Sequence, residues 1–87
     1  VGPYVGMAVE QREDGVYVAH VDKGRKSPAR KAGVKVGDRI AEWNKAPVAN
    51  TTRFNDIMSK AKSGDRVELI VFRKGKRKRL KLTMGKT

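Results

Sequence analysis

Few side chains in this chain are of the kinds that do covalent or metal chemistry. It has one histidine and no cysteine, so neither a Cys–His pair nor a cluster of thiolate metal ligands can form. His20 lies between Ala19 and Val21 in a predicted strand, where it would face solvent or a groove. Ser27 precedes a proline and is better explained as a helix cap than as a nucleophile. The carboxylates follow no spacing that favours acid–base catalysis. We therefore predict no catalytic residue, metal or cofactor, and expect the chain to act by binding.

Charge is the second property of the sequence that bears on function. The chain carries 21 lysines and arginines against nine aspartates and glutamates, a formal net charge of +12. A field of this size raises association rates with acidic partners and weakens as the salt concentration rises. Acidic peptides, anionic lipids and nucleic acids would all respond to it, so charge alone does not choose between them.

Length and composition indicate one small domain over residues 1–87. Hydrophobic residues make up 38% of the chain and are spread along it, which is enough for one modest core and too many for global disorder. No apolar run has the length needed to cross a membrane, and no signal peptide is visible. The absence of cysteine leaves the redox compartment open. Because the chain begins at Val1 and not at a methionine, we expect it to be excised from a larger protein.

The stretch from Ser27 to Val48 is the most informative about local structure. Ser27 can cap a helix, and the proline after it suits the first helical position because its missing N–H would be unpaired there. Gly33 stands where the end of a helix commonly needs a left-handed residue. Gly37-Asp38 signals a second turn, and Ile40–Trp43 supplies the apolar positions of a strand.

Hydrophobic periodicity predicts the remaining elements. A second helix is expected at residues 51–62, capped by Asn50 or Thr51, because apolar residues recur there at helical spacing. Strands are expected at Met7–Val9, Val16–Val21, Arg66–Phe72 and Arg77–Met84. The third is apolar on both faces, as in an interior strand, whereas the last alternates, with Leu80, Leu82 and Met84 facing the core. Five to six short strands and two helices indicate a mainly β fold, a small partly open barrel or sandwich capped by two α-helices.

The order of these motifs resembles that of PDZ domains, in particular the permuted, HtrA-like type of bacterial and protease-associated proteins. The resemblance covers almost the whole chain and rests on Tyr4-Val5-Gly6-Met7, Gly15-Val16-Tyr17-Val18, Ser27-Pro28-Ala29, Ala32-Gly33, Gly37-Asp38 and Gly64-Asp65-Arg66-Val67. It implies that no strand precedes the loop at residues 4–7 and that the C-terminal strand, Lys78–Met84, takes that place. One departure from the family pattern is the turn Asn44-Lys45, where Asn-Gly is usual, so a residue other than glycine has to adopt a positive φ.

Binding of a partner's C-terminus, or of an internal extended segment, is what the resemblance implies. The partner would add as a β-strand beside Met7–Glu10, and backbone N–H groups of a loop would hold its terminal carboxylate. By resemblance, that loop is Tyr4, Val5, Gly6 and Met7. The groove beside it would consist of Ala8, Val9 and Glu10 from the strand and Thr51, Asn55 and Met58 from the second helix.

The resemblance also implies an apolar pocket for the ligand's last side chain, lined by Val5, Met7, Met58 and Ile57. Methionine adapts its shape, so the pocket would accept several apolar end groups; the alternative for the methionines is plain core packing. Thr51 stands where many PDZ domains carry histidine, which removes the basis for the usual serine or threonine preference two residues before the ligand's end. The positive charge favours ligands that are acidic upstream of the last residue.

Two other interpretations remain open. A basic run could bind anionic lipid and tether the parent protein to a membrane; it consists of Arg73, Lys74, Lys76, Arg77, Lys78, Arg79 and Lys81. The alternative for this run is a solvated hairpin whose lysines protect a sheet edge. Nucleic acid is not favoured, because aromatic residues interleaved with the charges are nearly absent apart from Phe72. The chain could also be the regulatory PDZ domain of a serine protease whose catalytic residues lie outside this sequence. We expect it to be monomeric in isolation.

Overall fold

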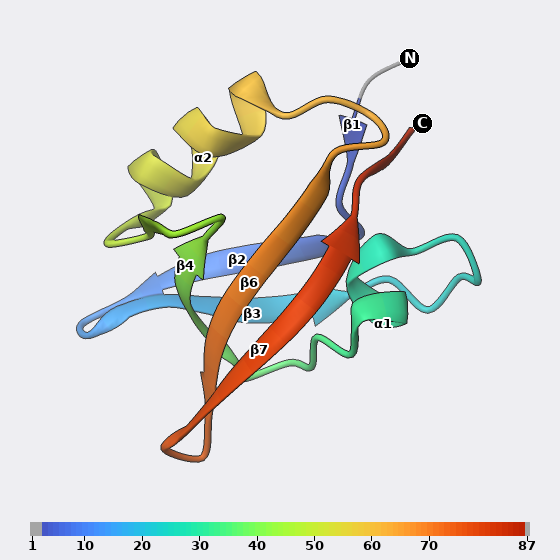
Figure 1. The fold of residues 1–87 in the computed structure, drawn as a ribbon. Coiled ribbons are helices and arrows are strands. Elements are labelled where there is room, and N and C mark those ends of the chain that lie inside the picture. The colour runs from blue at the N-terminus through green and yellow to red at the C-terminus, as the bar shows by residue number, and fades with distance from the viewer. Residues whose placement is uncertain (1–2, 87) are drawn as a thin grey trace.

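The computed structural model describes residues 3–86, which form a mainly β fold with two helices (Figure 1). The predicted fold class is confirmed. In chain order the elements are β1 (Pro3–Tyr4), β2 (Met7–Arg12), β3 (Gly15–Val21), α1 (Pro28–Ala32), β4 (Arg39–Trp43), β5 (Ala46–Pro47), α2 (Thr51–Lys60), β6 (Arg66–Arg73), β7 (Lys76–Thr83) and β8 (Gly85–Lys86). None of the helices found in residues 3–86 is long and apolar enough to cross a membrane.

One six-stranded antiparallel sheet organises the fold. Its strands lie in the order β2-β3-β4-β6-β7, and β5 pairs with β4 outside that path. β6 pairs with both β4 and β7. This interior position explains why β6 is apolar on both faces, as predicted. β2 ends the sheet on one side, and among the described strands its only partner is β3.

The core fills the space that the curved sheet and the two helices enclose. Residues from four strands and both helices contribute to it, with Ile40, Leu69 and Val71 fully buried. Trp43 of β4 packs edge-to-face on Phe54 of α2, with ring centroids 6.1 Å apart. That aromatic contact fixes α2 against the sheet, because such a pair adds directional attraction to the burial of two large rings.

The strand β7 alternates as predicted. Leu82 is 2% exposed and Met84, just after the strand, is 3% exposed, whereas Lys81 and Thr83 between and beside them face solvent. The helix α1 packs beside this strand (Figure 1). The polar face of β7 is therefore free of the core and carries the basic residues of the hairpin.

The helix boundaries follow from their caps. The Oγ of Ser27 accepts a hydrogen bond from the N–H of Arg30 at 3.3 Å, and Gly33 follows α1 with a φ of 90°, as predicted. Asn50 caps α2, and its Oδ1 accepts from the N–H of Arg53 at 2.8 Å. α2 ends at Lys60 and not at residue 62, because Ala61 is extended and the N–H of Lys62 donates to Asp65.

The expectation that no strand precedes the loop at residues 4–7 is wrong, because Pro3–Tyr4 forms β1 and pairs with β8. The register is Pro3↔Lys86 and Tyr4↔Gly85. Tyr4 is thus a strand residue and not only a loop residue, and the segment that pairs with it follows the main C-terminal strand. The turn between β4 and β5 does have the strained backbone that the sequence predicts, with φ of 51° at Asn44 and 71° at Lys45.

Candidate functional site

The loop between β1 and β2 is anchored by its carbonyl groups. The carbonyl oxygen of Val5 accepts from the N–H of Ala29 at 2.9 Å, and that of Gly6 accepts from the N–H of Asp22 at 2.9 Å and from the Oγ of Ser27 at 3.2 Å. The peptide bonds are trans, so each N–H points away from the carbonyl of its own peptide unit. The N–H groups of Gly6 and Met7 therefore point away from α1 and β3. Within residues 3–86 the Gly6 N–H forms no hydrogen bond.

Gly6 is required at this loop for two reasons. Its φ is +81°, a conformation that residues with a side chain rarely adopt. A Cβ at this position would also overlap the Oγ of Ser27, which is itself 1% exposed. The cap of α1 therefore packs directly on the loop, and the helix fixes the direction of the loop's N–H groups.

A cavity of about 330 Å³ opens in front of this loop. Its lining comes from β1, the loop and β2, from the end of β3 and the residue after it, from α2 and from the residue before β8: Pro3, Tyr4, Val5, Gly6, Met7, Ala8, His20, Asp22, Met58 and Met84. Val5, Met7 and Met58 also pack against the hydrophobic core. The cavity therefore has an apolar interior with the unpaired N–H of Gly6 at one wall.

A polar cluster lies at the edge of this cavity. The hydroxyl of Tyr4 donates to Oδ2 of Asp22, and Nε2 of His20 lies 3.1 Å from Oδ1 of the same carboxylate. The hydrogen bond to Asp22 raises the pKa of Tyr4 above its usual value of 10, and partial burial acts in the same direction. Tyr4 is thus a neutral donor at physiological pH, and it ties β1 to the end of β3.

Beyond the cavity, α2 lies beside β2, and the predicted peptide groove is the strip between these two elements (Figure 1). The N–H of Thr51 donates to Oε1 of Gln11 at 2.9 Å, which joins the start of the helix to the far end of the strand. Thr51 is half-buried, as is Met58, and Asn55 between them is exposed. On the strand side, Ala8 and Glu10 are exposed, and the half-buried Val9 packs against the core. The edge of β2 that faces this groove has no strand partner within residues 3–86.

A comparison with protein families decides what this arrangement is. The family model for the PDZ domain matches residues 3–84, nearly the whole chain. The chain belongs to the PDZ domain family. The predicted resemblance is confirmed, and as a PDZ domain the chain is a non-catalytic module.

Similar proteins are serine proteases that contain such a domain. The chain is 39% identical over 83 residues to "Serine protease Do-like HtrB" of Bacillus subtilis, which covers 94% of this chain and 18% of that protein. It is 36% identical over 74 residues to "Probable periplasmic serine endoprotease DegP-like" of Ectopseudomonas mendocina, covering 85% of this chain and 15% of that protein. This PDZ domain therefore spans less than a fifth of the length of these relatives.

Solved structures share the fold at lower sequence identity. The HtrA-type protease AlgW with a decapeptide superimposes with a TM-score of 0.85 and 22% identity, over 97% of this chain and 29% of that one. The HtrA3 PDZ domain bound to the phage-derived ligand FGRWV gives a TM-score of 0.76 and 18% identity, over 95% of this chain and 88% of that one. At these identities the likeness establishes the fold.

The cavity of this PDZ domain brings together only part of the predicted site. Tyr4, Val5, Gly6, Met7, Ala8 and Met58 line it, whereas Val9, Glu10, Thr51 and Asn55 do not. Ile57 does not join them; it lines a separate cavity on the other side of α2, with Trp43 and Arg53. The helix turns by about 100° per residue, so Ile57 and Met58 face different sides.

Four further residues line the cavity: Pro3, His20, Asp22 and Met84. The sequence predicts that His20 faces solvent or a groove, whereas it does not indicate the other three at this site. The pairing of Ala8 with His20 puts the histidine beside the loop. Continuing the register of Arg12↔Gly15 along the two strands would give Ala8↔Ala19 instead, but a β-bulge shifts the register between Ala8 and Val9. A one-residue slip of this kind moves a side chain to the other face of the strand.

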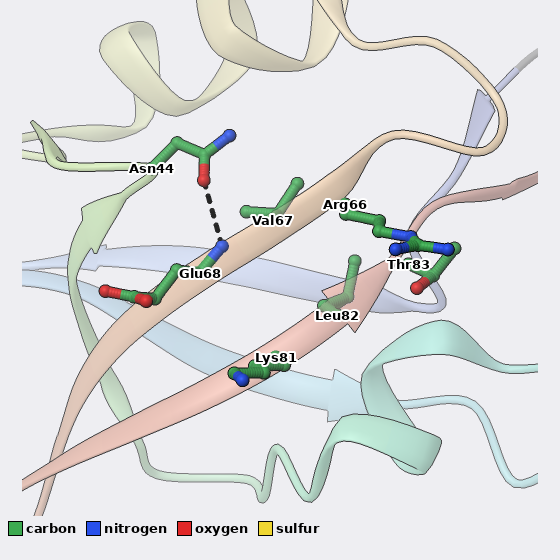
Figure 2. A pocket seen from close by; sticks show the side chains of 7 residues that line it. All are labelled: Asn44, Arg66, Val67, Glu68, Lys81, Leu82 and Thr83. Carbon is green, nitrogen blue, oxygen red and sulfur yellow. Dashed lines mark hydrogen bonds between the residues drawn. The ribbon is translucent and has the colours of Figure 1, made fainter.

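A second cavity, of about 310 Å³, lies over β6 and β7 and shares no lining residue with the groove cavity (Figure 2). Its lining residues are Asn44, Arg66, Val67, Glu68, Lys81, Leu82 and Thr83. Asn44 leans over the strand from the β4–β5 turn, and its Oδ1 accepts from the N–H of Glu68 at 3.0 Å. This hydrogen bond attaches the β4–β5 turn to β6 at the edge of the cavity.

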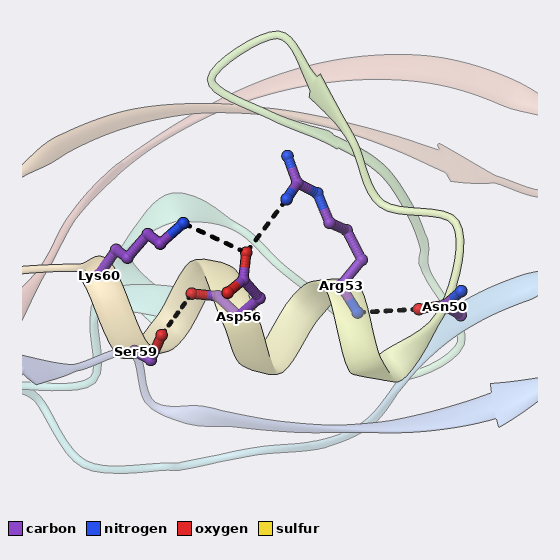
Figure 3. A network of polar contacts seen from close by, with 5 residues as sticks. All are labelled: Asn50, Arg53, Asp56, Ser59 and Lys60. Carbon is purple, nitrogen blue, oxygen red and sulfur yellow. Dashed lines mark hydrogen bonds and ion pairs between the residues drawn. The ribbon is translucent and has the colours of Figure 1, made fainter.

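The outer face of α2 carries a polar network that stabilises the groove wall (Figure 3). Asp56 binds Arg53 at 3.1 Å and Lys60 at 3.6 Å, at helical spacings of three and four residues. The hydroxyl of Ser59 donates to the carbonyl oxygen of Asp56 at 2.7 Å. Such exposed pairs add a few tenths of a kcal/mol each, so they support the helix without fixing its position.

The predicted basic patch is not uniform. Arg73 is turned inward, with its Nη2 2.7 Å from Oδ2 of the buried Asp38. Arg79 lies 3.6 Å from Glu68 on the outer face of the sheet. The remaining members are exposed: Lys74, Lys76, Arg77, Lys78 and Lys81.

Proposed function

We propose that this PDZ domain binds the C-terminal segment of a partner protein, which adds as an antiparallel strand to β2 in the groove beside α2. One observation carries the proposal: the edge of β2 has no partner within residues 3–86, and α2 lies alongside it as the second wall. An exposed edge presents a row of backbone donors and acceptors that an extended peptide can satisfy.

The loop would hold the terminal carboxylate of this ligand. The N–H groups of Gly6 and Met7 point away from α1 and β3, and the positive φ of Gly6 lets neighbouring N–H groups converge on one anion. The last side chain of the ligand would then enter the cavity between Met7, Met58 and Met84. Because methionine is flexible, we expect several apolar end residues to be accepted.

Residues upstream of the ligand's end are expected to be acidic. The net charge of +12 speeds the approach of negative peptides, and this preference falls as salt screens the field. An internal extended segment that offers no carboxylate would use the β2 edge alone and bind less tightly.

The test is an NMR titration of amide shifts with a pool of peptides ending in Val, Leu, Ala or Phe, beside the same peptides amidated at the C-terminus. We expect shifts at residues 5–10 and 51–58 that are weakened at least tenfold by amidation, since the amide removes the charge that the loop binds. Equal shifts from both pools would replace carboxylate capture by an internal-segment mode. An absence of shifts in both segments would overturn the proposal.

Neighbouring positions on α2 offer a matched pair of variants. Met58→Glu puts a carboxylate into the cavity, next to the ligand's own, whereas Ser59→Glu puts the same charge on the adjacent, exposed position. We expect Met58→Glu to abolish binding and Ser59→Glu to leave it within about twofold. A circular dichroism melt of each variant separates loss of binding from loss of the fold.

We also propose that the domain regulates a serine protease of which it forms part. The relatives at 36–39% identity carry protease names, and this chain corresponds to 15–18% of their length. The test adds the binding peptide to the parent protein and follows hydrolysis of a protease substrate. Regulation through the groove is supported if the peptide changes the hydrolysis rate of the parent protein but not that of its Met58→Glu variant. An unchanged hydrolysis rate of the parent protein under saturating peptide contradicts it.

A further inference from the structure

One end of the molecule combines exposed positive charge with an exposed aliphatic side chain. Val36, in the loop between α1 and β4, is the one large hydrophobic residue within residues 3–86 that is exposed, at 63%. A single exposed valine is ordinary on a protein surface. Its surroundings are not ordinary, because Lys35 precedes it and the basic β6–β7 turn is attached to the same loop.

Arg73 makes that attachment. Its Nε and Nη2 donate to the two carboxylate oxygens of Asp38 at 2.8 and 2.7 Å, and Nη2 also donates to the carbonyl oxygen of Gly33 at 2.8 Å. Asp38 in turn accepts from the N–H of Lys35 at 3.0 Å. The loop of residues 33–38 is therefore held at the end of β6, where the turn Lys74-Gly75 begins.

The charges at this end are almost all positive. Lys35, Lys74, Lys76 and Arg77 are exposed and have no carboxylate within salt-bridge distance among residues 3–86. Asp38 is neutralised by Arg73, so the nearby Asp14 is the carboxylate that remains charged beside these four cations. The hydroxyl of Tyr17 donates to Asp14 at 2.6 Å and holds the pKa of its carboxyl below the usual value. A surface that meets this end therefore experiences a strong positive potential around one apolar side chain.

Two aromatic rings lie beside this end, and each already has a cationic partner. The guanidinium of Arg12 lies 4.5 Å from the ring centroid of Tyr17, and that of Arg39 lies 4.6 Å from the centroid of Phe72. Nucleic-acid bases need free ring faces to stack on. These rings are covered on one face by the protein's own arginines. This favours a partner that binds through charge and apolar contact over a nucleic acid, whose bases would stack on the rings.

We propose that this end, made of Lys35, Val36, Lys74, Lys76 and Arg77, binds the surface of an anionic phospholipid bilayer. The basic side chains contact the phosphate headgroups, and Val36 enters the boundary between headgroups and acyl chains. Each basic residue near an anionic bilayer strengthens binding. At high salt the charges are screened, and the apolar contact of Val36 then retains part of the affinity for the bilayer.

The bilayer-binding end and the peptide groove are compatible with each other. The β6–β7 turn lies at the bottom of Figure 1, while β1 and the loop that follows it lie at the opposite side of the molecule. A domain held through the turn therefore keeps the groove open, so its peptide ligand and the bilayer bind at the same time.

The experiment is co-sedimentation of the chain with vesicles of phosphatidylglycerol and phosphatidylcholine, or of phosphatidylcholine alone, at low and high salt. We expect binding only to the phosphatidylglycerol vesicles, with an affinity that Lys74→Glu/Lys76→Glu lowers by about tenfold or more. The matched control is Lys45→Glu/Lys62→Glu, which makes the same change in net charge at two exposed lysines elsewhere and is expected to lower affinity only a few-fold. Val36→Ser should remove the binding that persists at high salt.

Three outcomes overturn the proposal. They are no sedimentation with phosphatidylglycerol, an equal loss in the test and control variants, and tighter binding to single-stranded DNA or soluble polyphosphate with no effect of Val36→Ser. The second assigns binding to overall charge, and the third assigns it to a soluble polyanion. Amide spectra of every variant establish that it is folded, so a loss of binding is assigned to the surface.

Discussion

The guanidinium of Arg73 donates two hydrogen bonds to the carboxylate of Asp38, with both N–O distances below 2.9 Å. Asp38 is 1% exposed and the side chain of Arg73 is 23% exposed, so water screens the pair little. The hydrogen bonds to Asp38 raise the pKa of Arg73 above its usual value, which keeps it charged at every pH at which the protein folds. The pair joins the end of β6 to the loop before β4.

Removing one partner of this pair is expected to destabilise the domain strongly. Arg73→Ala leaves the buried carboxylate of Asp38 without its cation, a change that typically costs about 3–5 kcal/mol. That is a large share of the roughly 5–15 kcal/mol by which small domains are stable. Urea denaturation measures it, as a fall in the free energy of unfolding at constant slope.

The control for this prediction is an ion pair of the same type on the surface. Arg53 and Asp56 lie 3.1 Å apart, but their side chains are 48% and 44% exposed. We expect Arg53→Ala to cost less than about 1 kcal/mol. Equal losses in Arg53→Ala and Arg73→Ala would contradict the assignment of Arg73 to the interior.

Arg73 also illustrates what the sequence could and could not predict. It stands first in a run of basic residues, and nothing in that run distinguishes it from the exposed lysines that follow. Its partner, Asp38, is 35 residues away and lies in a predicted turn. The distinction depends on a tertiary contact, which local patterns do not contain.

Local signals were sufficient elsewhere. Ser27, Pro28 and Gly33 predict α1 with its correct ends, because capping depends only on neighbouring residues. The sequence predicts an end of α2 two residues too late, because the apolar spacing continues to Ala61. In the structure the N–H of Lys62 donates to the side chain of Asp65, and the helix ends at Lys60. The sequence does not predict Met84 at the cavity, because the pairing of β1 with β8 sets its position. It predicts that His20 faces solvent or a groove, but not that His20 pairs with Ala8, because a β-bulge shifts the register there.

Replacing Gly6 is expected to damage both stability and binding. Gly6→Ala combines a positive φ of +81° with an overlap between the new Cβ and Ser27. The overlap should cost about 1–3 kcal/mol beyond the backbone strain. Relief of the clash would move the loop, so the affinity for a C-terminal peptide should fall as well. Thermal melts and the peptide titration measure the two effects.

Gly64 provides the comparison for Gly6. Its φ is +88°, but a Cβ there meets nothing within 4 Å. Gly64→Ala should therefore show the backbone strain alone, about 1–2 kcal/mol, with unchanged peptide affinity. If the two variants lose the same stability, Ser27 does not constrain the loop.

The two tyrosines are expected to titrate above their usual pKa. Tyr4 donates to Asp22 and Tyr17 donates to Asp14, and these hydrogen bonds are the main reason that both pKa values lie above 10. A pKa that folding raises means that the neutral tyrosine is favoured in the folded state. Its stabilising contribution is complete below pH 10 and is lost as the pH rises through the folded-state pKa.

Absorbance at alkaline pH tests this directly, because the chain has two tyrosines and both are affected. We expect the phenolate transition to lie above pH 10 in the folded protein and to return to about 10 in urea. Asp22→Asn should lower the transition of Tyr4 alone, and Asp14→Asn that of Tyr17 alone. A folded-state transition at or below pH 10 would contradict the two hydrogen bonds.

The cap of α2 links helix stability to the groove. The Oδ1 of Asn50 accepts from the N–H of Arg53 at 2.8 Å (Figure 3). The next residue, Thr51, donates its N–H to Gln11 of β2 at 2.9 Å. Asn50→Ala removes the first contact and should cost about 1 kcal/mol, whereas Asn50→Asp, which keeps an acceptor at the helix start, should cost little. Because the first turn of α2 forms one wall of the groove, Asn50→Ala should also speed amide hydrogen exchange at residues 53–55 more than in β6. Uniform acceleration across α2 and β6 would mean that the cap acts only on global stability, and that the helix start does not open by itself.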